Sequence, residues 1–298
     1  MESLLSPKQI ADAIGASESS VKRWCDQGLL SSIKTAGGHR RIPVQEALKF
    51  VREQNYEVVE PRILAMPDTA NRRARRIEGC ADRLFDALIA ANELAARSIV
   101  FELYVAGFPV SQICDEVIAV AFHRIGDRWA CHDIDVYQER CSCEIAMRLL
   151  HELRSKQTSP DRKLLALGST IEGDYYSIPV TMAEIVLRSA GWDARLLGTS
   201  IPFDSLEAAL RQHRPGLFWL SVSHIDDEAT FISRFNRLLA IAAECDTAIV
   251  AGGHALTSAI RAQLSFCSFC DTMRHLEDCS RRLAGGSVVK PSPGSSSP

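Results

Sequence analysis

The apolar residues of this chain change their spacing near residue 160, and this change limits the possible folds more than any other feature. From Lys163 onward, short apolar runs alternate with amphipathic segments; the runs are KLLALGST, DARLLGTS, LFWLSVSH and TAIVAGGHA. Strands that alternate with helices across short loops form a parallel sheet. We therefore expect a doubly wound α/β domain over residues 161–284, with a ligand site at the carboxyl ends of its strands.

Residues 76–156 show a helical spacing of apolar residues instead. Amphipathic stretches cover residues 77–107, 111–130 and 135–155, and short breaks separate them. Helices joined by short breaks pack against each other in antiparallel fashion. A four-helix bundle is therefore the simplest arrangement for this part of the chain.

Polar stretches that contain prolines separate these segments and are typical of linkers, at residues 55–76 and 156–162. The last residues, 285–298, are rich in Gly, Ser and Pro and predict a disordered tail. The chain thus divides into an N-terminal domain with its linker over residues 1–70, a helical domain, the α/β domain and the tail.

The first 54 residues predict two short helices separated by a turn, which is the helix-turn-helix pattern. Ser6 followed by Pro7 begins one helix, and Ser17 or Ser19 caps the next, SESSVKRWCDQG, which ends at Gly28. The segment LLSSIKTAGGHRRIP then predicts a β-hairpin whose turn contains two glycines. A further helix, VQEALKFVREQ, completes this domain.

Basic residues gather at two places in the N-terminal domain. Lys22, Arg23 and Trp24 lie on the second helix, where a recognition helix enters the major groove of DNA. The hairpin carries the other candidates, Lys34, His39, Arg40 and Arg41. Because arginine and lysine supply charge and hydrogen bonds for the DNA backbone, this pattern predicts binding to double-stranded DNA.

The composition is that of a globular protein, and its formal net charge of -3 hides the local basic surface. Since no apolar run reaches the roughly 20 residues of a membrane span, we expect a cytoplasmic protein without a membrane partner. Its ten cysteines are then expected to be reduced thiols. Cys267 and Cys270 have the spacing of zinc ligands, but no second Cys/His pair lies at a suitable distance, so no metal site is expected.

The order of a helix, a helix with Arg-Trp, then GLL and GGHRR resembles the winged-helix domain of MerR-type transcriptional regulators, over residues 1–54. The remainder resembles the cobalamin-binding module of the light-responsive, B12-dependent members of that family, a helical cap followed by a Rossmann-like domain. The resemblance implies a transcriptional regulator that binds a DNA operator and forms homo-oligomers, either dimers or tetramers. It also implies that the chain is not an enzyme.

In the helical cap, the resemblance assigns the upper face of the corrin ring to a tryptophan, a valine seven residues later and a Glu-His pair. Trp129, Val136 and Glu139 match this pattern, whereas Arg140 stands at the histidine position. The upper axial ligand of the family is therefore lost or replaced in this chain.

The lower face of the corrin is contacted in that family by a loop with the order Asp or Glu, one residue, His, two residues and Gly. The stretch GDYYSIP places Asp174 at the acidic position, Tyr176 at the histidine and Pro179 at the glycine, with Tyr175 in between. A phenol is a poor cobalt ligand, so coordination from this loop is not expected. The phenol ring can still stack on a flat tetrapyrrole.

Further short motifs lie where the family lines the nucleotide tail of cobalamin with a serine and a glycine pair. These are Ser221 and Ser223 in LSVSH, and Gly252 and Gly253 in IVAGGHA. A glycine pair after a strand also serves any tight turn, and its place after the fourth expected strand adds weight here. His224 and His254 end two expected strands and are candidates to replace a lost axial ligand.

Three interpretations of this module stay open. It binds cobalamin without a protein ligand, it binds another tetrapyrrole such as haem or a bilin, or it is a ligand-free oligomerisation core. Cys131-His132 resembles the bilin-attachment dipeptide of phytochrome-type photoreceptors, in which a thiolate adds to the tetrapyrrole. A bound ligand would change how protomers associate and thereby the occupancy of DNA.

The rival class is a cobalamin-dependent methyltransferase component, which combines a similar cap with a Rossmann-like domain. Such a component requires the histidine-bearing lower loop and a catalytic partner. It has no reason to begin with a DNA-binding domain, so we expect a regulator.

Overall fold

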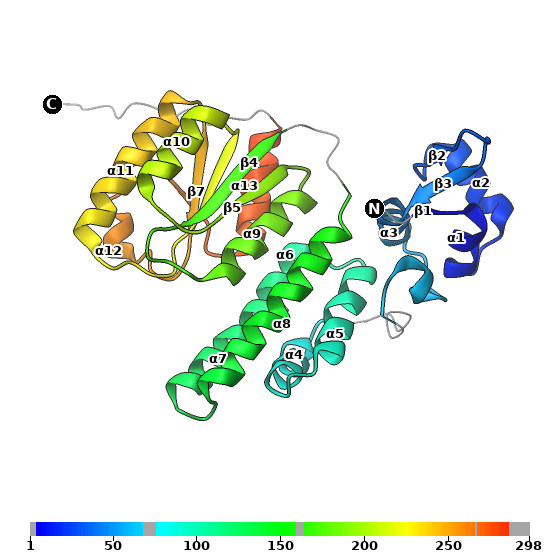
Figure 1. Cartoon of the computed structure of the whole chain (residues 1–298), viewed down its shortest axis with the longest axis horizontal. Helices are drawn as coiled ribbons and strands as arrows, with labels where there is room; N and C mark the ends of the chain where they lie inside the picture. Colours follow the sequence, from blue (N-terminus) through cyan, green and yellow to red (C-terminus); the bar gives the residue numbers. More distant parts are fainter. Residues whose placement is uncertain (1–3, 68–75, 159–163, 266, 286–298) are drawn as a thin grey trace.

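The structure, a computed structural model, describes residues 4–67, 76–158, 164–265 and 267–285 of the chain. Figure 1 shows consecutive units: an N-terminal unit in blue, a helical unit in cyan and green, and an α/β unit whose colours run from green to red. The helical unit contacts both of the others. None of the described helices is long and apolar enough to cross a membrane.

The N-terminal unit combines helices with a small antiparallel sheet. Its elements are β1 (Leu4–Leu5), α1 (Pro7–Ile14), α2 (Glu18–Asp26), β2 (Ile33–Lys34), β3 (Arg40–Pro43) and α3 (Val44–Glu53). Strand β3 pairs with β1 and with β2, so the predicted hairpin is present. Two predicted caps are present as well, because the Ser6 hydroxyl accepts the Gln9 N–H and the Ser17 hydroxyl accepts the Ser20 N–H.

The stretch after α3 is not the free linker that its prolines suggested. Val58 and Leu64 are buried, and the chain forms a 3-10 turn, η1 (Pro61–Leu64). The Val59 N–H donates to the carbonyl oxygen of Ala13 near the end of α1. The apolar residues on either side of Pro61 therefore pack onto the N-terminal unit.

The helical unit contains α4 (Cys80–Ile89), α5 (Glu93–Val105), α6 (Val110–Ile113), the π-helix η3 (Cys114–Ile118), α7 (Ala119–Ala130) and α8 (Val136–Ser155). The amphipathic stretch over residues 77–107 contains two helices, α4 and α5. Ala91 adopts a left-handed backbone, and the Asn92 side chain caps α5 by accepting the Ala95 N–H. The left-handed backbone at Ala91 thus follows the end of α4, and the cap at Asn92 begins α5, although the apolar repeat continues through both.

The α/β unit is a parallel five-stranded sheet with helices on both faces. Its elements are β4 (Leu165–Ile171), α9 (Ser177–Ser189), β5 (Asp193–Ile201), α10 (Phe203–His213), β6 (Leu217–Ser221), α11 (Glu228–Glu244), β7 (Ala248–Gly252), α12 (Ser258–Arg261), β8 (Ser268–Phe269) and α13 (Met273–Ala284). The strand order is β5-β4-β6-β7-β8. Helices α10 and α11 pack on one face, and α9 and α13 on the other. The expected parallel α/β arrangement is confirmed, and β8 adds a strand too short to appear in the apolar pattern.

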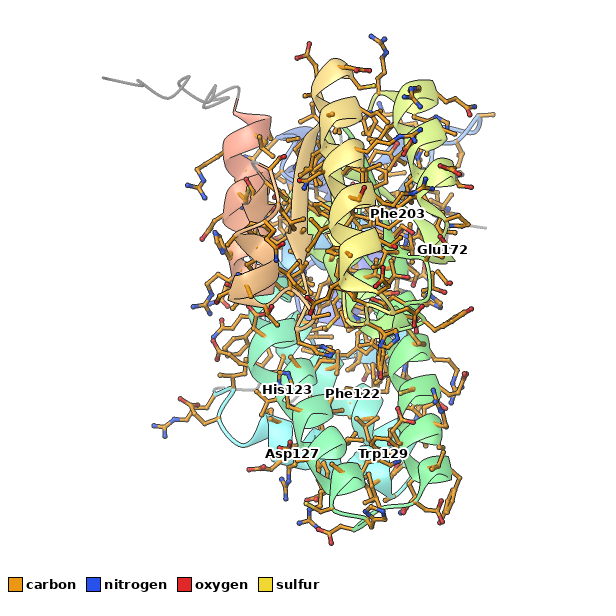
Figure 2. All side chains as sticks on the ribbon, turned by 90° about the vertical axis from the view of Figure 1, so that its left-hand side faces the viewer. Phe122, His123, Asp127, Trp129, Glu172 and Phe203 are labelled. Atoms are coloured by element: carbon orange, nitrogen blue, oxygen red, sulfur yellow. The ribbon has the colours of Figure 1, made fainter. Side chains whose placement is uncertain are left out.

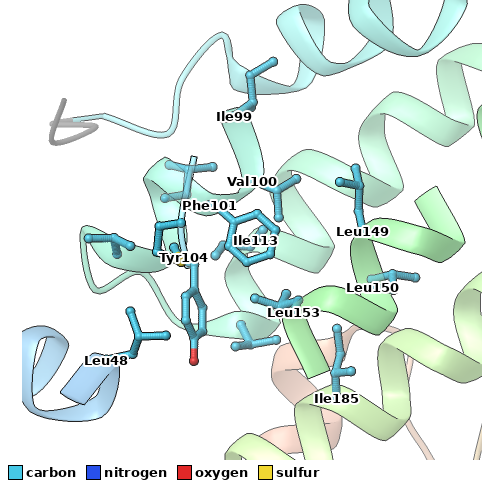
Figure 3. Packing of buried hydrophobic residues seen from close by; sticks show 14 of the residues in the cluster. Leu48, Ile99, Val100, Phe101, Tyr104, Ile113, Leu149, Leu150, Leu153 and Ile185 are labelled. Carbon is cyan, nitrogen blue, oxygen red and sulfur yellow. The ribbon is translucent and has the colours of Figure 1, made fainter. Parts of the chain in front are cut away.

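A continuous apolar cluster joins the units (Figure 3). It extends from Leu48 on α3, past Tyr104 on α5 and Leu153 on α8, to Ile185 on α9. The guanidinium carbon of Arg52 lies 3.8 Å from the centroid of the Tyr104 ring. Through these contacts α3 of the N-terminal unit is anchored directly on the helical unit.

Charged groups also attach the helical unit to the α/β unit. The Asp115 carboxylate on η3 accepts hydrogen bonds from the Met273 and Arg274 N–H groups at the start of α13, at 2.7 and 2.9 Å. A carboxylate is favourable there because it binds free N–H groups and opposes the helix dipole. A second such contact joins α8 to α9, where Arg154 Nε lies 2.9 Å from Oε1 of the buried Glu184.

Candidate functional site

The exposed face of α2 carries the first group of candidates. Lys22 and Arg23 are exposed, and Lys22 Nζ lies 2.8 Å from Glu18 Oε1, one helical turn away. Surface ion pairs of this kind are weak. Both basic side chains can therefore turn to an anionic ligand that approaches α2.

Trp24, the third candidate on α2, packs against the rest of the N-terminal unit, which the sequence did not indicate. Its ring is half-buried, and its centroid is 5.0 Å from that of Phe50 and 5.2 Å from that of Tyr56. The three aromatic rings pack α2 against α3 and the segment that follows it. Trp24 therefore positions α2, and its contact with DNA stays a prediction.

Arg40 on β3 also has an internal role that the sequence did not indicate. Its Nη1 donates to the Lys22 carbonyl oxygen at 2.7 Å, and its Nη2 donates to the Asp26 carboxylate. The hydrogen bond from Arg40 holds the pKa of Asp26 below its ordinary value. Arg40 thus braces the hairpin against α2 and is not a free cation.

The hairpin presents Lys34 and His39, which are both exposed. Gly38 in the turn has a φ of 77°, a left-handed conformation that glycine adopts without strain. Arg41 is half-buried, and its Nη1 donates to the Arg40 carbonyl oxygen at 3.4 Å. Because Arg40 joins this hairpin to α2, one basic surface results, formed by Lys22, Arg23, Lys34 and His39.

The candidates in the helical unit gather at the turn between α7 and α8. Trp129 and Val136 are 51% and 52% exposed, and Cys131 and His132 lie exposed between them. Figure 1 shows this turn at the end of the helical unit that lies away from the sheet, and Figure 2 shows Trp129 below Phe122 along α7. Large apolar side chains are thus uncovered beside a thiol and an imidazole.

Glu139 and Arg140, near the start of α8, contact each other. Glu139 Oε2 lies 3.3 Å from Arg140 Nε, and Glu139 Oε1 accepts a hydrogen bond from Cys143 Sγ at 3.2 Å. Burial, together with this hydrogen bond, raises the pKa of the Cys143 thiol to about 12. A guanidinium has no lone pair to offer, so Arg140 cannot replace a histidine as a metal ligand.

Asp174 organises the loops at the carboxyl edge of the sheet. Its buried carboxylate accepts hydrogen bonds from the N–H groups of Tyr176, Ser223 and His224, at 2.9, 2.6 and 3.3 Å. The loop after β4 is thereby tied to the loop after β6. A carboxylate with three backbone donors has little capacity left to orient the side chain at position 176.

The two tyrosines that follow Asp174 lie uncovered at this edge. Tyr175 and Tyr176 are 75% and 57% exposed, and the Tyr176 ring meets the His254 ring edge-on, with centroids 6.4 Å apart. His224 Nε2 lies 2.8 Å from Oδ1 of Asp226, a partner that sequence analysis missed. The pair of aspartates after β6 was the available signal for it.

The glycine pair after β7 has a role in the fold itself. A Cβ on Gly252 would lie 2.4 Å from the Cys270 carbonyl oxygen, and one on Gly253 would lie 2.2 Å from the Val222 carbonyl oxygen. Both positions therefore require glycine for the close approach of neighbouring backbone. The pair does not by itself indicate a ligand cradle.

These residues match a flat tetrapyrrole ring only in part. Apolar side chains are uncovered at the α7–α8 turn and at the sheet edge, but the turn lies at the end of the helical unit away from the sheet, so the structure does not bring the two groups together. An imidazole ligand is absent from the position that the family uses, where Tyr176 stands. Ser221 and Ser223 are buried at the sheet edge, which leaves little of either side chain for a ligand to contact.

Two protein families match parts of this chain. Residues 4–55 match the family model described as a helix-turn-helix domain, and residues 80–154 match the one described as a B12 binding domain. No curated protein matches the chain.

Three solved structures match part of this chain. The monomethylamine corrinoid protein of Methanosarcina barkeri is 17% identical with a TM-score of 0.58, and the match covers 70% of this chain and 100% of that chain. A cobalamin-binding protein from Desulfitobacterium hafniense DCB-2 is 15% identical, covering 67% of this chain and 96% of that one, with a TM-score of 0.37. The methanol:cobalamin methyltransferase complex MtaBC from Methanosarcina barkeri is 14% identical, covering 74% and 85%, with a TM-score of 0.37.

At such identities the likeness to the monomethylamine corrinoid protein shows the fold alone. Together with the two family matches, it supports the arrangement that the residues indicated. A helix-turn-helix unit precedes a cobalamin-binding-like unit in one chain.

Proposed function

We propose that this chain is a DNA-binding transcriptional regulator of the MerR type, whose helical and α/β units bind a corrinoid and thereby change DNA occupancy. The observation that carries the proposal is the shared apolar cluster from Leu48 to Ile185, which places α3 of the helix-turn-helix unit on the helices that match the B12 binding model. A ligand that moves α8 would move the surface on which α3 rests.

The basic surface of α2 and the hairpin supports the DNA-binding half of the proposal. Lys22, Arg23, Lys34 and His39 are exposed on it, and Arg40 holds its two parts together. In the winged-helix arrangement that we propose, α2 enters the major groove and the hairpin is the wing. The regulator would bind as a homo-oligomer, so that two such surfaces span two half-sites.

Charge at the sheet edge favours a corrinoid over haem or a bilin. The loops at residues 172–177, 222–228 and 252–257 contain no Lys or Arg, and their carboxylates are Glu172, Asp174, Asp226, Asp227 and Glu228. Haem and bilins carry anionic propionates, which such an edge repels, whereas corrin side chains are neutral amides. An alkylated corrinoid would supply a light-sensitive cobalt–carbon bond, and this would make light a possible signal.

Purified full-length protein tests the proposal directly. The chain would be expressed with a corrinoid (hydroxocobalamin or cobinamide), haem or biliverdin supplied separately, and its absorbance would be recorded before and after illumination. We expect a visible band only after a corrinoid is supplied. A denaturation-resistant band after biliverdin that disappears in Cys131→Ala would instead identify a covalent bilin, and no band at all would leave an oligomerisation core.

The regulatory step needs a second measurement on the same samples. DNA fragments enriched by the full chain from a random-sequence pool would be titrated with the loaded and unloaded protein, and light scattering would give the oligomeric state of each. Equal DNA affinity and equal oligomeric state in both forms would contradict regulation by the ligand.

A further inference from the structure

Trp219 on β6 fills the space between the sheet and α9. Its side chain is 2% exposed, and a Cβ on Gly168 of the neighbouring strand β4 would lie 1.9 Å from the indole Cε2 atom. The indole Nε1 donates to the Val180 carbonyl oxygen on α9 at 3.4 Å. The indole therefore lies flat over β4 and is held in place from the helix side.

The same face of the sheet contains the positions that the family resemblance assigns to the nucleotide tail. Side chains alternate along a strand, so Ser221 lies on the face of Trp219, one step closer to the carboxyl edge. Ser221 is in register with Thr170 on β4 and with Gly252 on β7. A tail that passes these residues toward the interior would meet the indole of Trp219.

The glycine positions do not provide an alternative path. The space that a side chain at Gly252 would take is occupied by the carbonyl oxygen of Cys270, and at Gly253 by the carbonyl oxygen of Val222. In this part of the described chain, backbone atoms of the protein occupy the space that a pocket for the nucleotide tail would need.

The charge of the edge opposes a phosphodiester for an independent reason. The N-terminus of α11 is already capped, because Asp227 Oδ2 accepts the Thr230 N–H at 2.8 Å, and the carboxylate of Asp174 lies just before α9, where its Oδ1 accepts the Tyr176 N–H. The nearby loops supply no Lys or Arg to compensate. A phosphate at this edge would face carboxylates.

We propose that the module accepts the ring of a corrinoid and excludes its nucleotide tail, with Trp219 as the residue that determines this specificity. The ligand class is then an incomplete corrinoid of the cobinamide type, which lacks the phosphate, ribose and benzimidazole of cobalamin. This inference rests on the proposed function, since it presumes that the module binds a corrinoid.

Competitive titration of the ligand-free full chain tests the inference. Dicyanocobinamide and cyanocobalamin would be compared by equilibrium dialysis with absorbance detection. We expect cobinamide to bind at least about tenfold more tightly. Cyanocobalamin binding as tightly as cobinamide would overturn the inference and leave the proposed function standing, whereas binding of neither would overturn both.

Variants of Trp219 test whether this side chain causes the difference in affinity between cobinamide and cyanocobalamin. Trp219→Leu opens the face beside Gly168, so the affinity for cyanocobalamin should rise and the ratio of the two affinities should fall toward one. Trp192→Phe is the matched control, because Trp192 is equally buried in the same apolar cluster but donates to Ser280 on α13. Its ratio should stay at the wild-type value.

Far-ultraviolet circular dichroism would establish that each variant is folded. Trp219→Phe serves as a smaller change if Trp219→Leu does not fold, and the wild-type ratio decides the question without any variant. An unchanged ratio in a folded Trp219 variant would overturn the assignment of specificity to this residue.

Discussion

Arg40 on the hairpin and Lys22 on α2 are joined by a hydrogen bond of 2.7 Å, from Arg40 Nη1 to the Lys22 carbonyl oxygen. The Asp26 carboxylate at the end of α2 accepts from the other terminal nitrogen of the same guanidinium. A planar guanidinium with two fixed acceptors has one orientation. The spacing between α2 and the hairpin is therefore set before DNA arrives.

The Asp26→Asn variant distinguishes two effects of Asp26 on DNA affinity: its negative charge and its hydrogen bond to Arg40. Removing a carboxylate from a basic surface should strengthen DNA binding if charge alone decides the affinity. If bracing decides it, Arg40 loses its ionic partner and binding weakens, by about threefold or more. We expect the weaker binding, measured by fluorescence anisotropy on pool-selected DNA. Asp12→Asn, on the exposed side of α1, is the control and should not weaken binding.

Arg23 should behave differently because nothing in the described fold depends on its exposed side chain. We expect Arg23→Ala to weaken DNA binding and to lower the slope of log affinity against log salt by about one, as the loss of one phosphate contact requires. The measurement is a series of DNA titrations between low and moderate salt. Arg195→Ala on the distant β5 should leave both quantities unchanged, and an unchanged slope in Arg23→Ala would remove Arg23 from the DNA contacts.

The periodicity of the chain predicted most of the architecture, because period and cap residues act locally. The helix-turn-helix order, the hairpin with its glycine turn and the parallel sheet were all expected from such signals. The break at Asn92 was missed because the apolar repeat continues on both sides of it. Likewise, Val58 and Leu64 looked like linker residues because their stretch contains two prolines and many polar residues, although both are part of the core.

The candidate site was harder to predict, since it depends on which side chains meet across the fold. Arg40 and Trp24 stand within basic motifs, yet one is bound by Asp26 and the other packs against Phe50. The contact of Trp219 with Gly168 joins residues 51 positions apart and leaves no local pattern. Sequence alone therefore indicated which segments carry the candidate residues, but not the side chains that these residues contact.

The ion pair between Arg154 and Glu184 predicts a pH-dependent loss of stability. Burial already raises the pKa of Glu184 above its ordinary value of 4.5. The folded protein thus holds this proton more tightly than the unfolded chain does, and the free energy of unfolding falls as the pH rises above 4.5. In Arg154→Met the charged carboxylate also loses its partner, so this fall should steepen.

We therefore expect Arg154→Met to lower the free energy of unfolding by about 2 kcal/mol at pH 7, less than for a fully buried pair because Arg154 is half exposed. At pH 4.5 the loss should shrink, since the raised pKa of Glu184 leaves its carboxyl group largely protonated there. Urea unfolding at both pH values measures this difference. Arg148→Met, whose partners Glu93 and Glu144 are exposed, should change little at either pH, and a loss in Arg154→Met that does not depend on pH would contradict the assignment.

Tyr176 provides the most direct test of how the ring is held. We expect Tyr176→His to shift the visible bands of the corrinoid-loaded protein, because a neutral imidazole nitrogen binds cobalt far better than a phenol does. Tyr176→Phe should leave the bands in place, since it removes the hydroxyl and keeps the exposed aromatic ring. A shift in Tyr176→Phe would show that the phenol itself coordinates the metal. No shift in a folded, loaded Tyr176→His would place the ring out of reach of this loop, and the sheet edge would then not be the surface that covers it.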